Sequence, residues 1–200
     1  NCKSMLSWTT LRDFGSVVFL SLVWRVGKRE RKDKNVFKIV RTEALTDAIY
    51  LMDVEAPRVA KNCLPGQFVI VRGSEDGERI PLTICDYSRE AGTITIVFQV
   101  VGAATEMMKN LKVGDSFTDF VGPLGRPSEL VEEDLETLKN KKILFVAGGV
   151  GTAPVYPQVK WLHEHGVAAD VIIGGRSKEL IILEEQMKAV AGNLYITTDD

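Results

Sequence analysis

An apolar run that ends in a cluster of glycines, with a helical pattern after it, constrains the fold of this chain more than any other stretch. Residues 143–147 predict a strand, Gly148, Gly149 and Gly151 follow it, and a helix is expected over residues 153–165. Free backbone N–H groups and the helix dipole favour an anion at such a helix N-terminus, and glycine lets the backbone approach it closely. The sequence therefore predicts a phosphate site here, with a tight turn that binds nothing as the alternative.

The same stretch opens an alternating series of strands and helices. Pro154 stands where the G-x-G-x-x-G dinucleotide motif has its last glycine, and proline suits the first turn of a helix. The alternation predicts a parallel sheet with right-handed crossovers. A doubly wound domain normally carries further strands, so we expect a fragment cut within this domain. The expected strands are residues 143–147, 170–174 and 194–198, and the expected helices are residues 153–165 and 179–191.

The first half of the chain has the pattern of an all-β domain. Short apolar–polar runs separated by turn residues predict a barrel or a sandwich. Leu64-Pro65-Gly66 is typical of a type II turn, and the alternation over residues 93–100 predicts a half-buried strand. The expected strands are residues 37–41, 49–55, 68–71, 93–100 and 116–121.

Charge and cysteine content limit the classes of partner. Residues 1–35 carry eight Lys or Arg against three Asp or Glu, which leaves seventeen against twenty-four in the remaining 165 residues. That acidic balance is not the basic patch of a nucleic-acid-binding protein, so no nucleic-acid partner is expected. Three widely spaced cysteines (Cys2, Cys63 and Cys85) match no metal spacing and favour the reducing cytoplasm.

Residues 1–35 form an atypical extension. The apolar run at residues 17–24 is shorter than the roughly 20 residues that span a bilayer. The basic cluster follows this run, whereas a signal peptide carries its basic residues in front. No membrane association is expected, and three interpretations stay open: a mis-assigned or artificial extension, an unusual anchor, or a genuine amphipathic arm.

Two further motifs bear groups that suit a phosphorylated ligand. In Arg79-Ile-Pro81-Leu82-Thr83, the guanidinium can bind phosphate and the hydroxyl can bond a ring heteroatom. In Val100-Val-Gly102-Ala-Ala-Thr105, a strand meets a helical pattern. The alternatives are an ordinary surface arginine before a strand and a threonine that only caps a helix.

Together the three motifs resemble the ferredoxin–NADP reductase superfamily. The likeness covers residues 36–200 and is greatest to the small FAD subunit of NADH-dependent ferredoxin–NADP oxidoreductases and sulfide dehydrogenases. These subunits are related to the electron-transfer subunit of dihydroorotate dehydrogenase, which implies a link to pyrimidine biosynthesis. The resemblance implies an N-terminal antiparallel β-barrel (FAD domain, residues 36–127), a linker helix (residues 128–141) and a truncated Rossmann-like parallel α/β domain (NAD(P)-binding, residues 142–200).

The resemblance also implies roles for individual residues. One flavin segment comprises Arg79, Pro81, Leu82 and Thr83, with Thr83 as the catalytic residue near the isoalloxazine. The second flavin segment comprises Val100, Gly102 and Thr105, of which Gly102 and Thr105 grip the pyrophosphate. The dinucleotide is held by Gly148, Gly149, Gly151, Thr152, Pro154, Arg176 and Ser177. Arg176 and Lys178 favour the 2′-phosphate of NADP, whereas the subgroup implies NADH, and the choice stays open.

The activity that this implies is hydride transfer between NAD(P)H and FAD. Electrons would then pass to an iron–sulfur centre and a larger flavin/iron–sulfur partner subunit, with ferredoxin as a further partner. The family's 2Fe–2S cluster is held by a later cysteine-rich segment, so no metal site is expected here, and Cys63 and Cys85 are expected to be buried structural thiols. The rival interpretations are a flavin-binding subunit or remnant without turnover and a methyltransferase-like domain.

Overall fold

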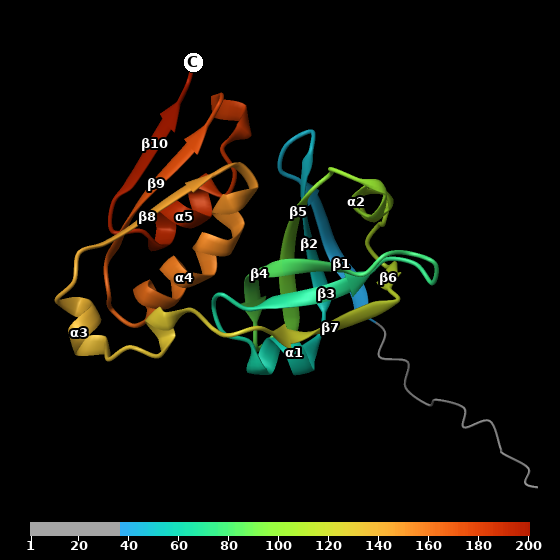
Figure 1. Cartoon of the computed structure of the whole chain (residues 1–200), viewed down its shortest axis with the longest axis horizontal. Coiled ribbons are helices and arrows are strands. Elements are labelled where there is room, and N and C mark those ends of the chain that lie inside the picture. The colour runs from blue at the N-terminus through green and yellow to red at the C-terminus, as the bar shows by residue number, and fades with distance from the viewer. Residues whose placement is uncertain (1–36) are drawn as a thin grey trace, which may run out of the picture. The chain divides into compact units, whose positions relative to one another are not determined.

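Two sheets organise residues 37–200, the part of the chain that the computed structural model describes, and both belong to one contact unit (Figure 1). The first sheet has seven antiparallel strands in the order β6-β1-β2-β5-β4-β3-β7. The strands are β1 (Phe37–Ala44), β2 (Ile49–Glu55), β3 (Phe68–Arg72), β4 (Ile80–Ser88), β5 (Thr93–Gln99), β6 (Ser116–Phe117) and β7 (Asp119–Leu124).

The seven-stranded sheet closes on itself. Its two edge strands, β6 and β7, are consecutive in the chain and are separated only by Thr118, whose N–H donates to the Arg72 carbonyl (2.9 Å). Edges that are joined by one residue require the sheet to curl into a barrel. The predicted antiparallel barrel is therefore confirmed, and buried side chains such as Met52, Ile96 and Phe98 fill it.

The turn and helices of the barrel follow local rules. Gly66 has φ +90° and the Gln67 N–H donates to the Leu64 carbonyl (3.3 Å), as the predicted type II turn requires. A short helix that the sequence patterns did not predict, α1 (Pro57–Asn62), begins on a proline. Helix α2 (Ala103–Lys109) follows the V-V-G-x-x-T motif.

The second sheet has three parallel strands in the order β10-β9-β8, which confirms the predicted Rossmann-like α/β arrangement. Figure 1 shows its helices on one side of the strands. The strands are β8 (Ile143–Gly148), β9 (Ala169–Gly175) and β10 (Leu194–Thr198), and the helices are α4 (Thr152–Glu164) and α5 (Glu184–Val190). Short 3₁₀ turns lie before them, η2 (Gly149–Gly151) and η3 (Lys178–Leu180).

Two helices differ from their predicted extent. The helix expected over residues 179–191 is divided, because Leu183 adopts a left-handed conformation (φ 57°) between η3 and α5. The helix expected over residues 128–141 is replaced by η1 (Glu129–Val131) and α3 (Leu135–Lys139). Asp134 starts α3 anew, because its carboxylate accepts from the Thr137 N–H (2.9 Å).

Helix α4 packs directly on the outside of the barrel. Its Ala153, Tyr156 and Val159 share a buried cluster with Val97 of β5. Lys160 of the same helix also pairs with Asp86 of β4 (2.7 Å). Val97 is therefore buried although the alternation of β5 directs it away from the barrel core.

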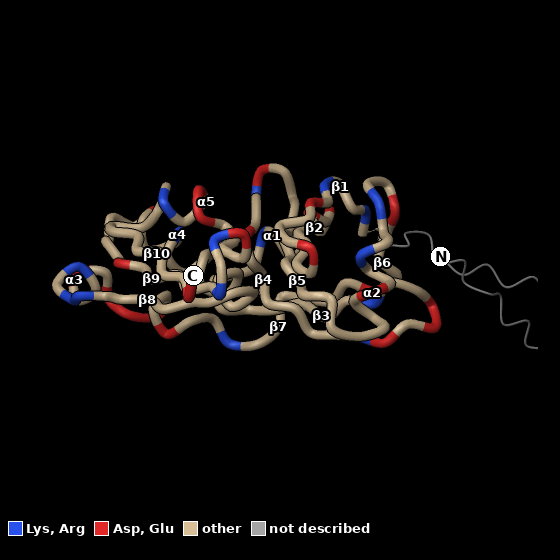
Figure 2. The backbone as a smooth tube through the Cα atoms, turned by 90° about the horizontal axis from the view of Figure 1, so that it is seen from above, with Lys and Arg blue, Asp and Glu red and all other residues tan. Residues whose placement is uncertain are grey.

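Charged residues of both signs are interspersed over the described chain (Figure 2). Lys and Arg lie among Asp and Glu and do not gather into one band along residues 37–200 (Figure 2). None of the helices in that part of the chain is long and apolar enough to span a bilayer.

Candidate functional site

A cavity of about 480 Å³ lies where the barrel meets the start of α4, and we call it the β4–α4 cavity. It brings together residues from all three sequence motifs, although these lie up to 73 positions apart in the chain. The predicted site residues that line it are Pro81, Leu82, Thr83, Thr105, Gly151 and Pro154.

Strand β4 delivers the first motif to this cavity. Its first half pairs with β3, where Thr83 lies opposite Phe68, and its second half pairs with β5. The strand therefore turns from one neighbour to the other beside the motif. Thr83 is half-buried at this turn and lines the cavity.

The second motif folds by a hydrogen-bonded cap. The Thr105 hydroxyl accepts from the N–H groups of Val101 (3.0 Å) and Gly102 (3.1 Å) and donates to the Gly102 carbonyl (2.9 Å). Thr105 is therefore not the N-cap residue, which is Gly102, but caps the helix from position N3, and these bonds saturate its hydroxyl. The donors that remain for a ligand are first-turn N–H groups such as those of Ala103 and Ala104, which have no helical carbonyl to bond.

Arg79 and Val100 lie outside both cavity walls. The Arg79 guanidinium is 59% exposed and bonds Asp119 of β7 (2.6 Å). The same carboxylate oxygen also forms an ion pair with the Arg72 Nε (2.7 Å). Arg79 is thus held outside the β4–α4 cavity by the Asp119 carboxylate, which also pairs with Arg72. Val100 packs against the barrel core.

The glycine loop is built for close approach. Gly149 has φ +54°, a conformation that side chains rarely adopt, and no atom lies within 4 Å of where a Cβ would stand at Gly149 or Gly151. At Gly148 a Cβ would meet the Gly174 carbonyl at 3.3 Å. The loop therefore leaves open space beside exposed backbone, which is what an anion or a dinucleotide needs.

Thr152 behaves differently from its neighbours in the motif. It is fully buried and lines neither cavity, and its hydroxyl has no hydrogen-bond partner among residues 37–200. Thr152 is therefore buried at the start of α4, directly after the loop, and is not part of either cavity wall.

A second cavity of about 410 Å³, the sheet-edge cavity, lies at the carboxyl ends of β8 and β9. That edge is where open α/β sheets bind ligands. Its walls include the predicted residues Gly148, Gly149 and Arg176, and also Thr46 and Ile49 of the barrel. Ser177 follows Arg176 without lining the cavity, and its side-chain hydrogen bond lowers the pKa of the Glu179 carboxyl.

The two cavities have the size of ligand sites and adjoin each other. Each falls in the range of about 300–1,000 Å³ typical of small-molecule pockets. Gln99 and Val150 line both cavities, so the two cavities share part of their walls. Sequence reasoning missed Gln99, and its only signal is its place just before the V-V-G-x-x-T motif.

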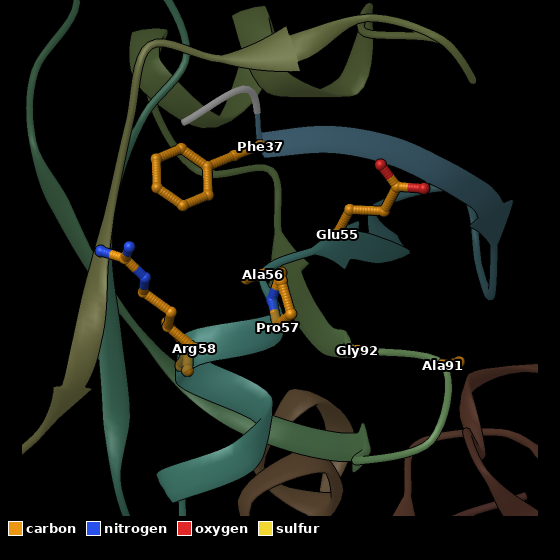
Figure 3. Close-up of a pocket in the computed structure, with 8 residues that line it drawn as sticks. Phe37, Glu55, Ala56, Pro57, Arg58, Ala91 and Gly92 are labelled. Atoms are coloured by element: carbon orange, nitrogen blue, oxygen red, sulfur yellow. The ribbon is translucent and has the colours of Figure 1, made fainter. Parts of the chain in front are cut away.

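A third hollow of about 320 Å³ lies at the other end of strands β2 and β5 and involves none of the predicted residues. Strands of seven residues separate this hollow from the β4–α4 and sheet-edge cavities by roughly 20 Å. In Figure 3 the Phe37 ring and the Arg58 side chain lie on one side of Pro57, and the Glu55 carboxylate lies on the other.

The described cysteines are buried, as expected. Cys63 and Cys85 are free thiols with at most 1% exposure, and burial raises the pKa of Cys63 to about 11. Both thiols are therefore protonated and unreactive near neutral pH. Within residues 37–200, no group of three His, Cys, Asp or Glu side chains is arranged to hold a metal ion.

Comparisons with known proteins agree with this architecture. An uncharacterized protein in the adh 3′ region of Clostridium beijerinckii is 61% identical over 165 residues, covering 82% of this chain and 56% of that protein. A dihydroorotate dehydrogenase B electron transfer subunit homolog of Thermotoga maritima is 38% identical over 162 residues (81% and 55%). No protein-family model matches the chain.

A solved structure of an NADH-dependent reduced ferredoxin–NADP oxidoreductase has the same fold. It superposes with a TM-score of 0.74 at 36% identity and covers 84% of this chain and 58% of that one. A closed antiparallel barrel, a following parallel sheet and a cavity where they meet define a reductase-type fold. The chain belongs to the ferredoxin–NADP reductase superfamily, which confirms the resemblance of its motifs. It spans a little over half the length of these relatives.

Proposed function

We propose that the chain is a flavoprotein electron-transfer subunit that carries a hydride between NAD(P)H and FAD. The observation that carries this proposal is the convergence of three distant motifs on one cavity that shares a wall with a second. The names of relatives, electron transfer subunits of dihydroorotate dehydrogenase B, support the same activity.

The residues fit the two cofactors. Pro81, Leu82 and Thr83 would hold the flavin ring in the β4–α4 cavity, with Thr83 as the residue that touches it. Gly102 and Thr105 would shape the turn that receives its pyrophosphate. Arg79 would reach that group from the rim once it leaves Asp119, which stays paired to Arg72.

The sheet-edge cavity would take the nicotinamide dinucleotide. Gly148 and Gly149 would admit its phosphates, supported by the buried Thr152, and Gly151 and Pro154 would face the flavin side. Arg176 and Ser177 would lie against the adenosine ribose, where a guanidinium favours a 2′-phosphate. When bound, the flavin would supply a hydride acceptor that can release electrons singly.

The wider setting is proposed on the same basis. Residues 36–127 would act as the FAD domain, 128–141 as the linker and 142–200 as the NAD(P) domain. Electrons would pass to an iron–sulfur centre, with the 2Fe–2S cluster held outside these residues, and to a larger partner subunit in the cytoplasm.

An anaerobic spectrum of the purified chain tests the proposal. The chain is incubated with FAD, freed of excess and titrated with NADH and NADPH in turn. Retained flavin bands that bleach with one nucleotide support the reductase half-reaction and identify the donor. Retained flavin that neither nucleotide bleaches would favour a flavin-binding subunit without turnover, and a chain that retains no flavin would contradict the proposal.

A further inference from the structure

The loop between β8 and α4 divides the two cavities at a single residue. Gly149 lines the sheet-edge cavity, Gly151 lines the β4–α4 cavity, and Val150 between them lines both. Across from this loop, Gln99 also lines both. A group that extends from one cavity into the other would therefore pass beside Val150 and Gln99.

Gln99 has a fixed backbone and a free side chain. It ends β5, where its Cα lies opposite Ile49 of β2, so the ladder holds its position. Its side chain is exposed, and no side-chain hydrogen bond engages its amide among residues 37–200. The amide therefore offers one acceptor and two donors to whatever occupies the junction.

The polar side chains on the two walls leave one candidate for the junction. Thr83 and Thr105 line only the β4–α4 cavity, and Thr46 and Arg176 line only the sheet-edge cavity. Gln99 is the only polar side chain in the described chain that lines both. Opposite it, Val150 offers an apolar contact for the face of a flat ring.

We infer that Gln99 is a positioning residue that pairs with the carboxamide of a bound nicotinamide at the junction of the two cavities. The inference rests on the proposed function. A hydride donor must lie within about 3.5 Å of its acceptor, so a nicotinamide held from the sheet-edge cavity must place its ring at the junction. Its carboxamide carries one carbonyl and one NH₂ group, the complement of the Gln99 amide.

A chemical double-mutant cycle tests this pairing by binding alone. Calorimetry measures Kd for NAD⁺ and for 3-acetylpyridine adenine dinucleotide, in which a methyl replaces the amide NH₂. If only NADPH bleaches the flavin, NADP⁺ and its acetylpyridine analogue are used. The proteins are the FAD-loaded wild type, Gln99→Leu and Gln186→Leu, where Gln186 is an exposed residue of α5 outside both cavities.

The ratio of the Kd for the acetylpyridine nucleotide to the Kd for the carboxamide nucleotide should be about 2- to 10-fold larger in the wild type and in Gln186→Leu than in Gln99→Leu. This factor corresponds to the contribution of one hydrogen bond. Equal preference in all three proteins would overturn the inference while the proposed function stands. FAD affinity, followed by flavin fluorescence, should be alike in the three proteins. A loss of FAD affinity in Gln99→Leu with unchanged nucleotide preference would assign Gln99 to the flavin and overturn the inference. A wild type that retains no flavin, or whose flavin neither nucleotide bleaches, would overturn the proposed function and the inference with it.

Discussion

Replacing Gly149 by alanine separates the cost of the loop conformation from the function of the loop. At φ +54° a side chain costs about 1–2 kcal/mol, and alanine recovers about 0.4–1 kcal/mol by restricting the unfolded chain. No atom lies within 4 Å of the added Cβ, so no clash contributes. The free energy of unfolding should therefore fall by only about 1 kcal/mol.

Nucleotide binding should suffer more than stability, because the added methyl occupies the space beside the loop N–H groups in the sheet-edge cavity. Hydrogen bonds to a charged group contribute about 1.5–3 kcal/mol, so the loss of one predicts at least a roughly tenfold weaker Kd.

Gly166→Ala is the matched control. Gly166 has φ +71°, also has no atom within 4 Å of a Cβ, and lies in the turn after α4, away from both cavities. Chemical denaturation should place the two variants within about 0.5 kcal/mol of each other. Calorimetric titration with NAD⁺ and NADP⁺ should show weaker nucleotide binding only for Gly149→Ala. Equal nucleotide affinity in both variants would refute the assignment of the glycine loop to the dinucleotide.

Three other substitutions should each change the free energy of unfolding in a way that the structure predicts. Gly151 has an ordinary helical φ of −65° and open space around a Cβ, so Gly151→Ala should leave the free energy of unfolding unchanged or raise it by up to about 1 kcal/mol. The same change should weaken FAD binding, because Gly151 lines the β4–α4 cavity. Unchanged flavin affinity would count against this cavity as the flavin site. Lys160→Met should lower the free energy of unfolding by about 1 kcal/mol, because it breaks a half-buried ion pair with Asp86. Lys139→Met, which breaks an exposed i,i+3 pair with Glu136, should lower it by only about 0.3 kcal/mol. Equal losses in chemical denaturation would show that the Lys160–Asp86 pair does not stabilise the packing of α4. Burial raises the pKa of Cys63 to about 11 from an ordinary value near 9, so its stabilising contribution is complete below pH 9 and is lost as the pH rises toward 11. In Cys63→Ala the fall in unfolding free energy between pH 9 and pH 10.5 should be shallower by up to about 1.4 kcal/mol per pH unit, and an unchanged slope would contradict this.

Local signals sufficed for much of the fold and for part of the site. The type II turn at Gly66 and the positive φ of Gly149 both follow from residues adjacent in the sequence. The glycine loop also meets its predicted context, because a strand precedes it and a helix follows it. Where a short motif carries its own geometry, neighbouring residues are enough to predict it.

Contacts between distant segments account for what the sequence did not predict. Val97 lies on the outer face of β5 by alternation, and only the packing of α4 on that face buries it. The pairing of Arg79 with Asp119 joins residues 40 positions apart, so the motif alone could not indicate it. Gln99 gains its place at the junction only when η2 lies across from the end of β5.

Helix α4 ties the geometry of the candidate site to the packing of the whole unit. Ala153 lines the β4–α4 cavity and also belongs to the buried cluster in which α4 packs against Val97 and Cys85 of the barrel. The distance between the glycine loop and β4 is therefore set by apolar side chains, which resist changes of even one methylene. Hydride transfer depends on placing two rings to within a fraction of an ångström, and a packed apolar interface can supply that accuracy without an acid or base in the cavity. The proposed hydride transfer would therefore account for a site whose walls are mostly glycine, proline and aliphatic side chains, with few titratable groups.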